Sequence, residues 1–524
     1  MNARRPLDLL AVAAEREGAA RVERAATERL AIEFAVGAAL ARGRDLAAVG
    51  SVASAADLLA AAASAGVGGL VVVAIDDPAL ALAPGETDAR VFARAAKVPC
   101  VEPTDAAECR GAVGASLRLS ERWGTPVVVR LTMRLALSGG AVALRARRYA
   151  LPAGRRSAFA ERALLPEYAP AQRNALDERL AQLAAHGADT SLNTVELRSA
   201  ELGVVASGIA ARHVREALPD ASILTLGLSW PVPTEVVRDF AGRVKRLVVA
   251  EEMEPLLEAE LRAGGIACEG KDLLPRHGEL LPDVLRRALG TPAPRSEARD
   301  VPPRPAEACP GCPHRPVLHA LKRLHVSAIA DLGCAAFGGR APLGGVEVAL
   351  AHSGAVALAH GVGAALLGRA RGRVVAVVGE SGLAAEATAL AHAVGAGPGA
   401  AVVAVTQDRA DATAALAAAL GAPARAVDAF DLGAVEDAVA AALRAERPAL
   451  VVARGRCART SAPPAQRFRV DPSRCNRCGA CLRLGCPAIA EGDGTMVIDA
   501  HRCAGCGVCA QVCRARAIER GATS

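Results

Sequence analysis

Cysteines are concentrated at the carboxyl end of this 524-residue chain, where eight of the fifteen fall within residues 475–524. They form two Cys-x2-Cys-x2-Cys runs, and a fourth cysteine follows each run. In two-cluster ferredoxins, a run of three thiolates holds three corners of a [4Fe-4S] cube, and the other run supplies the fourth ligand. The spacing therefore predicts two crossed quartets: Cys475, Cys478, Cys481 with Cys513, and Cys503, Cys506, Cys509 with Cys486.

Zinc knuckles and a disulfide framework are the two alternatives for such a segment. Zinc sites use two pairs of ligands rather than triplets, and disulfide frameworks are typical of small secreted chains. The triplet spacing therefore favours two [4Fe-4S] clusters and a role in electron transfer.

The elements that must position this chemistry are suggested by short apolar runs that alternate with Ala-rich helical stretches. Hydrophobic residues make up 52% of the chain but aromatic residues only 2%, so the cores must consist mainly of Ala, Val and Leu. Continuous apolar strands that alternate with helices indicate buried parallel sheets. The strands are expected at 70–75, 126–131, 202–206, 223–228, 247–250, 374–378, 402–405 and 450–453.

Proline-rich segments divide the chain. We expect an α/β fold with three parallel-sheet domains, followed by a small ferredoxin-like α+β domain that holds the two clusters. The expected divisions are 1–150, 151–290, a linker at 291–308, 309–456, a second linker at 457–474, and 475–524.

Charge and hydropathy bear on the partners and the location of the protein. Residues 454–520 contain twelve arginines and five acidic residues, a surplus equal to the whole net charge of +7. Almost no aromatic residue is present there to stack bases, so we expect no nucleic acid; an acidic redox partner or an ordinary solvated surface are the two interpretations. The apolar stretch Val346–Leu367 contains Glu347 and His352, which favours a buried helix over a membrane span. No signal peptide is recognisable, and a soluble cytoplasmic protein is expected.

Two of the expected strands end in residues that suit a phosphate and its metal ion. Val374–Val378 is followed by Gly379-Glu380-Ser381, and Val402–Val405 by Thr406-Gln407-Asp408. Ligands of open parallel sheets bind beyond the carboxyl ends of the strands, and Mg²⁺ prefers oxygen ligands. A structural corner that carries surface acids is the alternative.

These segments resemble a known family. The thiamine diphosphate motif is resembled by two short segments with 25 residues between them, Gly379-Glu380-Ser381 and Gln407-Asp408. Further segments resemble the alpha subunit of indolepyruvate ferredoxin oxidoreductase, a 2-oxoacid oxidoreductase. They are the two-cluster tail, Cys309-Pro-Gly-Cys312-Pro-His-Arg315 and Asp331-Leu-Gly-Cys334. The resemblance extends to Asp76–Pro78, Glu86–Arg90, Ala95–Pro99, Leu226–Pro233, Val248–Glu252 and Glu254-Pro255.

The resemblance implies an enzyme that oxidatively decarboxylates an aryl 2-oxo acid with coenzyme A, giving acyl-CoA, CO2 and reduced ferredoxin. It implies thiamine diphosphate with Mg²⁺ as cofactor and, as partner, a separately encoded beta subunit. It assigns the cofactor to Gly379, Glu380, Ser381 and Asp408, and the Mg²⁺ to Glu380 and Asp408. Glu28 matches the carboxylate that activates the cofactor, although an acid in the first turn of a helix is also ordinary.

Three departures from the family pattern keep a second interpretation open. The opening βα unit is missing, because Met1–Glu23 is interpreted as a short helical lead-in. Glu380 replaces the motif aspartate, and Asp408 replaces an asparagine. The alternative is a non-catalytic electron-transfer or scaffold protein on a decayed thiamine diphosphate fold.

Four cysteines outside the tail raise the question of a third cluster. Cys309 and Cys312 form a Cys-x2-Cys pair, Cys334 follows a short apolar strand, and Cys457 follows the last strand of its domain. Related pyruvate ferredoxin oxidoreductases hold a cluster near the cofactor with a similarly dispersed set. A third [4Fe-4S] cluster on these four residues is one interpretation; a loop or redox pair with two small buried side chains is the other.

Overall fold

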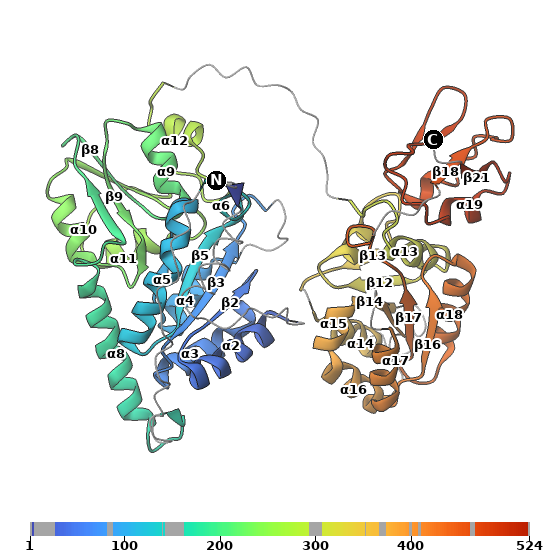
Figure 1. The fold of residues 1–524 in the computed structure, drawn as a ribbon, viewed down its shortest axis with the longest axis horizontal. Helices are drawn as coiled ribbons and strands as arrows, with labels where there is room; N and C mark the ends of the chain where they lie inside the picture. Colours follow the sequence, from blue (N-terminus) through green and yellow to red (C-terminus); the bar gives the residue numbers. More distant parts are fainter. Residues whose placement is uncertain are drawn as a thin grey trace. The chain divides into compact units, whose positions relative to one another are not determined.

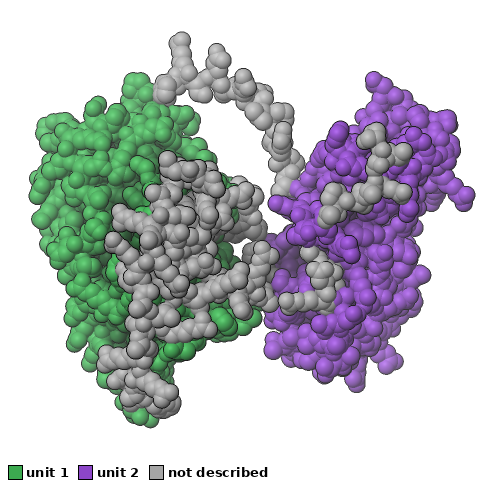
Figure 2. Space-filling view, viewed as in Figure 1, with its two compact units in different colours: residues 1–298 green, residues 299–524 purple. Residues whose placement is uncertain are grey.

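In a computed structural model the chain is described over residues 3–4, 27–80, 87–138, 140–141, 162–292, 307–351, 353–365, 374–397, 401–406, 410–461 and 467–521. It divides into two compact units, residues 1–298 (unit 1) and 299–524 (unit 2), which Figure 2 colours separately. Asp408 and almost all of Met1–Glu23 lie outside the described residues; of the expected helical lead-in, Ala3–Arg4 form a short strand, β1.

The first sheet of unit 1 has the strand order β10-β4-β5-β3-β2. Four of its strands are parallel, and β10, from the second half of the unit, adds antiparallel to β4. Alternate residues of β3 face opposite ways: Val72 packs against the helices on one face, whereas Val71 and Val73 pack against α5 on the other. The elements are α2 (Glu28–Arg42), β2 (Asp45–Val49), α3 (Ala56–Ser64), β3 (Leu70–Asp76), α4 (Ala89–Ala96), β4 (Cys100–Val101), α5 (Ala106–Trp123), β5 (Val127–Thr132), α6 (Met133–Leu137) and β10 (Leu228–Trp230).

The second sheet of unit 1 has the order β11-β8-β9-β7, in which only β7 is antiparallel. Because β10 belongs to the first sheet, residues 151–290 contribute to both sheets, and the expected boundary at 150 falls outside the described residues. The elements are α8 (Ala169–His186), β7 (Asn193–Glu196), β8 (Leu202–Ala206), α9 (Gly208–Ala217), β9 (Ser222–Leu226), α10 (Thr234–Ala241), β11 (Arg246–Ala250), α11 (Leu256–Ala263) and α12 (Pro282–Ala288).

Unit 2 contains a six-stranded parallel sheet in the order β13-β12-β14-β15-β17-β16. Val375 and Val377 of β14 pack on the side of α13 and α18, and Ala376 and Val378 on the side of α14 and α16. The elements are α13 (His314–Arg323), β12 (Ser327–Ala330), β13 (Val346–Val348), α14 (Ala355–Ala365), β14 (Val374–Gly379), α15 (Glu380–Ala385), α16 (Ala387–Ala396), β15 (Ala401–Thr406), α17 (Ala410–Ala419), β16 (Ala424–Asp428), α18 (Leu432–Arg444) and β17 (Leu450–Arg454).

Two expectations meet different outcomes in these sheets. The mixed α/β class with parallel sheets is confirmed, because the apolar runs become buried strands. The expected helix over Val346–Leu367 is wrong at its start: Val346–Val348 form β13, which pairs with β12, and the helix begins only at Ala355. Among the residues that the structure describes, no helix is long and apolar enough to cross a membrane.

The tail of unit 2 is a small domain of two antiparallel strand pairs, and it packs on the α13 and α18 side of the sheet (Figure 1). The Gln511 amide donates a 2.7 Å hydrogen bond to the carbonyl of Phe430 and accepts one of 3.0 Å from the Leu432 N–H, at the start of α18. The tail elements are β18 (Arg467–Val470), β19 (Ile489–Glu491), β20 (Met496–Ile498), α19 (Val508–Val512) and β21 (Ile518–Gly521).

Candidate functional site

Two cavities are each lined by one cysteine quartet of the tail. One cavity is lined by Cys486, Cys503, Cys506 and Cys509 (cavity A). The other is lined by Cys475, Cys478, Cys481 and Cys513 (cavity B). These are the two crossed quartets predicted from the spacing. Each cavity offers the four thiolates that a [4Fe-4S] cluster requires, so the lining residues fit such a cluster. Iron binding itself stays a prediction.

Left-handed glycines allow the chain to turn tightly around both cavities. Gly479, Gly485, Gly505 and Gly507 all have φ between 65° and 75°, a conformation that residues with a Cβ rarely adopt. The turns also bring backbone N–H groups to sulfur: the Gly505 N–H donates to Cys503 Sγ over 3.4 Å, and the Ala517 N–H donates to Cys513 Sγ over 3.2 Å. Such bonds favour the thiolate form that binds iron.

Burial opposes the ionisation of several of these thiols when no metal is bound. Burial raises the pKa of Cys509 to about 12, and it also raises the pKa of Cys481, Cys486 and Cys506. A metal that binds thiolates must therefore displace protons, and the cysteines hold it most tightly above neutral pH. All fifteen cysteines lie among the described residues, and none forms a disulfide there.

A third group of possible ligands lies at the start of α13. The ligand atoms of Cys312, His314 and Cys334 lie within 4.8 Å of one another. A hydrogen bond with Cys312 lowers the pKa of the Cys334 thiol to about 6, and burial lowers the pKa of His314 to about 4. A thiolate and a neutral imidazole are both suited to a metal ion. Sequence reasoning missed His314, although its place two residues after Cys312 was the available signal.

The other two cysteines of the expected third set come close without joining this group. The Cys312 N–H donates a 3.1 Å bond to the carbonyl of Cys309, so both belong to one turn. Ala458, which follows Cys457, lies 3.6 Å from where a Cβ on Gly311 would be. The structure thus brings all four segments together, and the group whose ligand atoms lie within 4.8 Å of one another consists of Cys312, His314 and Cys334, without Cys309 or Cys457.

The predicted pyrophosphate corner lies at the carboxyl edge of the six-stranded sheet. Gly379 ends β14 and pairs with Val405 of β15, so the ends of these two strands lie side by side. Glu380 opens α15 and is half-buried, and Ser381 is exposed. The fourth predicted residue, Asp408, lies outside the described residues, so its distance from Glu380 is not defined.

Next to this corner is a buried pair of carboxyl groups that sequence reasoning missed. Burial and the Glu386 charge raise the pKa of Asp331 to about 7. Both also bind the first turn of α14: Asp331 accepts from the Ala355 N–H (3.4 Å), and Glu386 accepts from the Val356 N–H (2.8 Å). Among the described residues, Asp331 Oδ2 and Glu386 Oε1 are buried without a hydrogen-bond donor, so a proton held between the two carboxyl groups would satisfy both oxygens.

In unit 1, Glu28 opens α2, whose N-cap is Thr27. Its Oε1 atom accepts a 2.9 Å hydrogen bond from the Ser51 N–H, in the loop that follows β2. Glu28 therefore has a structural role, and its catalytic role stays a prediction.

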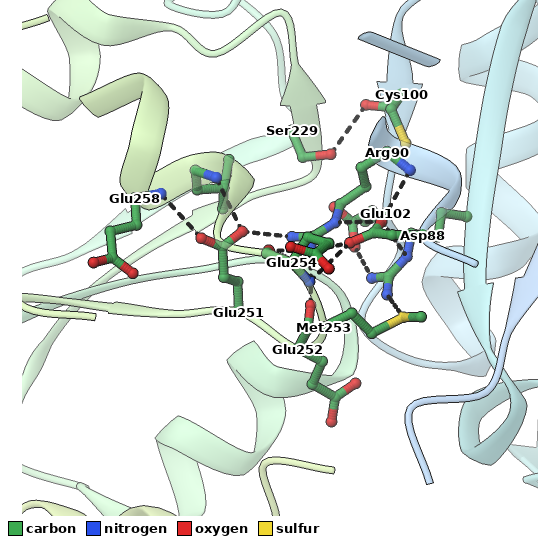
Figure 3. A network of polar contacts seen from close by, with 12 residues as sticks. Asp88, Arg90, Cys100, Glu102, Ser229, Glu251, Glu252, Met253, Glu254 and Glu258 are labelled. Carbon is green, nitrogen blue, oxygen red and sulfur yellow. Dashed lines mark hydrogen bonds and ion pairs between the residues drawn. The ribbon is translucent and has the colours of Figure 1, made fainter. Parts of the chain in front are cut away.

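A buried network of charges joins the two sheets of unit 1 (Figure 3). Arg90, at the start of α4, is wholly buried between Asp88 (2.6 Å) and Glu251 (2.7 Å), and it also donates to the carbonyl of Glu252. Burial would raise the pKa of Asp88, but the charges of Arg90 and Arg130 outweigh it and hold that pKa at about 2. Asp88 and Glu251 belong to two segments that the resemblance singled out separately, and sequence reasoning did not pair them.

Arg130 extends the network across the first sheet. Its guanidinium donates to Asp76 (2.5 Å) and Glu102 (2.6 Å) and contacts Met253 Sδ at 3.1 Å. Carboxyl groups outnumber arginines here, and burial raises the pKa of Asp76 to about 6. The network clamps the end of β11 to β3, β4 and β5.

Comparisons with known proteins found similar sequences and one similar structure. The 4Fe-4S binding domain family model matches residues 496–519. The chain is similar to "Indolepyruvate oxidoreductase subunit IorA" of Methanothermobacter thermautotrophicus, with 30% identity over 86% of this chain and 81% of that protein. It is also similar to the protein of the same name from Pyrococcus horikoshii, with 28% identity over 98% of this chain and 92% of that protein. Among solved structures, a 2-oxoglutarate:ferredoxin oxidoreductase from Magnetococcus marinus has a TM-score of 0.44, 14% identity and coverage of 55% of this chain and 64% of that chain.

Proposed function

Because this chain belongs to the IorA family of indolepyruvate oxidoreductase subunits, we propose that it is the catalytic and electron-transfer subunit of an enzyme that oxidatively decarboxylates an aryl 2-oxo acid such as indolepyruvate. The reaction consumes coenzyme A and yields acyl-CoA, CO2 and reduced ferredoxin. The two cavities, each lined by one cysteine quartet, carry this proposal, because an oxidoreductase of this kind must pass electrons out of the chain. Its relatives are named as one subunit of an oxidoreductase, which supports a separate partner subunit.

The three sheets and the tail take distinct roles in the proposal. Residues 1–150 form a pyrimidine-binding-like domain, 151–290 a transketolase C-terminal-like domain, 309–456 a pyrophosphate-binding domain, and 475–524 the two-cluster domain. The absence of disulfides among the described cysteines suits a reducing compartment such as the cytoplasm.

Thiamine diphosphate, when bound, supplies the electron sink that a 2-oxo acid needs in order to lose CO2. Gly379, Glu380, Ser381 and Asp408 hold its pyrophosphate, and Glu380 and Asp408 hold the Mg²⁺. The position of Gly379 and Glu380 at the carboxyl edge of a parallel sheet, beside β15, supports this assignment. Glu28 presents the activating carboxylate.

The cysteines carry the electrons that the oxidation releases. Each 2-oxo acid gives up two electrons, and each [4Fe-4S] cluster accepts one at a time. The quartets of cavities A and B hold two clusters. A third cluster on Cys309, Cys312, Cys334 and Cys457 lies closer to the cofactor corner; the proximity of Cys312 to Cys334 supports it.

Calorimetric titration of the full chain with thiamine diphosphate tests the cofactor assignment. Binding is expected with Mg²⁺ and not without it. Glu380→Gln should weaken binding, because a neutral oxygen replaces an anionic ligand, whereas Glu446→Gln, at an exposed position of the same unit, should not. A wild-type chain that binds no cofactor in the presence of Mg²⁺ would support the non-catalytic electron-transfer or scaffold protein instead.

A further inference from the structure

Arg315, the second residue of α13, is a buried cation whose described partners are all backbone carbonyls. The residue is 6% exposed. Its guanidinium donates to Leu484 O at 3.0 Å and to Cys309 O at 3.4 Å, and it makes two shorter bonds to Gly485 O and Ala308 O. A buried guanidinium without a carboxylate is costly unless another anion compensates it.

These carbonyls belong to two different cysteine loops. Cys309 begins the Cys-x2-Cys turn at the entrance of the α/β domain, and Gly485 immediately precedes Cys486 of the tail. One planar guanidinium therefore ties the two loops together through bonds in a fixed fork. Lysine could not reproduce this, because its single ammonium cannot span both loops with the same geometry.

The Cys309–Cys312 turn also lies against the second cysteine run of the tail. A Cβ on Gly311 would lie 2.4 Å from the Cβ of Ala504, which sits between Cys503 and Gly505. Cys312 lines cavity A, together with Arg315 and the four cysteines of that quartet. Cavity A is thus the tail cavity that adjoins the Cys309–Cys312 turn.

The remaining donor of Arg315 indicates what compensates its charge. Its Nε atom is buried and has no hydrogen-bond partner among the residues that the structure describes. Cavity A, which Arg315 lines, is where the four thiolates of Cys486, Cys503, Cys506 and Cys509 would carry negative charge. An anionic cluster there compensates the buried cation, and the cation in turn favours the reduced, more negative state of the cluster.

We propose that Arg315 positions the junction between the Cys309–Cys312 turn and the tail, and raises the reduction potential of the cluster in cavity A, which makes that cluster a better electron acceptor. This inference rests on the proposed function. Electrons enter the tail at cavity A and leave through cavity B, where Cys478 is exposed. Each transfer moves one electron: the donor on the cofactor side loses one, the cluster in cavity A gains one, and no atom changes place.

Redox titration of the full chain, followed by EPR, tests this proposal. In Arg315→Gln, one cluster should be reduced at a lower potential, with at least a tenfold change in its oxidised-to-reduced ratio, which is about 59 mV for one electron. The second cluster should be unchanged. Arg323→Gln is the matched control: Arg323 lies on the same helix but is 56% exposed and pairs with Glu436, so both potentials should stay at wild-type values. In a Cys478→Ala background, which removes the cluster of cavity B, the shifted potential should remain.

Several results would overturn the proposal. It fails if both potentials are unchanged in Arg315→Gln with full iron content, or if both shift equally. If Arg315→Gln loses iron, Arg315→Lys is measured in its place, because lysine keeps the charge. A smaller shift in the reduction potential of the same cluster supports the proposal. Loss of that cluster alone also supports it. Loss of all tail iron in both variants contradicts a local role. An iron-free wild-type chain would overturn the proposed function itself, which separates the two failures.

Discussion

Arg90 Nη1, in helix α4, lies 2.7 Å from Glu251 Oε2, which follows strand β11, although the two residues are 161 positions apart. Both side chains are essentially inaccessible to solvent. Asp88 also forms an ion pair with Arg90, so removing the cation leaves two buried carboxylates without their main partner.

We therefore expect Arg90→Met to lower the free energy of unfolding by about 3–5 kcal/mol, the usual effect of breaking a buried ion pair. Urea unfolding of the full chain measures it, with tryptophan fluorescence as the probe, because both tryptophans, Trp123 and Trp230, lie in unit 1. Arg94→Met is the control: its pair with Glu260 is partly exposed and should contribute about 0–1 kcal/mol. Equal effects of the two substitutions would contradict a structural role for the network.

The Asp331 and Glu386 pair predicts a pH dependence of stability in unit 2. Burial and Glu386 raise the folded pKa of Asp331 from 3.8 to about 7, so between these values the folded protein holds a proton that the unfolded chain releases. Stability should therefore decline as the pH rises from about 4 to about 7, with no further decline from this group above that.

Asp331→Asn removes this titration, so its stability relative to the wild type should improve from about pH 4 to about pH 7 and then level off. Urea unfolding followed by circular dichroism at several pH values measures the difference. Asp437→Asn, at an exposed position of α18, should show no such trend. A constant difference between Asp331→Asn and the wild type at all pH values would mean that the two carboxyl groups share no proton.

The third cysteine group predicts metal beyond that of the tail. With a third cluster, anaerobically purified chain should hold about twelve irons, four for each cubane. Cys334→Ser should lower this to about eight, because Cys334 lies within ligand distance of Cys312. Cys268→Ser, in unit 1, is the control and should change nothing. Eight irons in both the wild type and Cys334→Ser would leave these residues as a loop or redox pair, and zinc in their place would indicate a Cys/His zinc site.

Glu28 gives a kinetic prediction. Glu28→Gln keeps the oxygen that accepts from the Ser51 N–H, so the loop after β2 should remain in place. If the carboxylate activates the cofactor, turnover of the complex with its partner subunit should fall by several orders of magnitude while cofactor affinity stays near normal. Glu33→Gln, on the exposed face of the same helix, should retain full turnover. Wild-type turnover in Glu28→Gln would limit Glu28 to its structural role.

Local patterns predicted the parts of the molecule whose chemistry repeats along the chain. The triplet spacing named the quartets that line cavities A and B, since only a tight loop can present three thiolates to one cube. The apolar runs predicted the buried strands, because the strands of a parallel sheet that is covered on both faces must be apolar on both sides. The apolar run at 346–367 predicted a helix that starts too early, because β-branched Val346 and Val348 pair with β12 before the helix begins.

Contacts between distant charged residues could not be predicted from the sequence. Nothing near Arg90 signals Glu251, and nothing near Asp331 signals Glu386, because tertiary structure alone brings these side chains together. Arg315 is similar: it looks like an ordinary helix residue until Gly485, 170 positions away, accepts its hydrogen bond. Asp408, which sequence reasoning assigned to Mg²⁺, lies outside the described residues.

In the proposed reaction, oxidation of a 2-oxo acid places electrons on two [4Fe-4S] clusters held by the tail quartets. EPR of the anaerobic complex of this chain with its partner subunit, mixed with indolepyruvate and coenzyme A, tests this directly when it is combined with iron and sulfide analysis. Signals of reduced [4Fe-4S] clusters should appear only when both substrates are present, and Cys478→Ala and Cys506→Ala should each remove about four irons, those of one cluster. Two results would contradict this electron transfer. One is zinc instead of iron in the tail, and the other is clusters that contain iron but stay oxidised when indolepyruvate and coenzyme A are present.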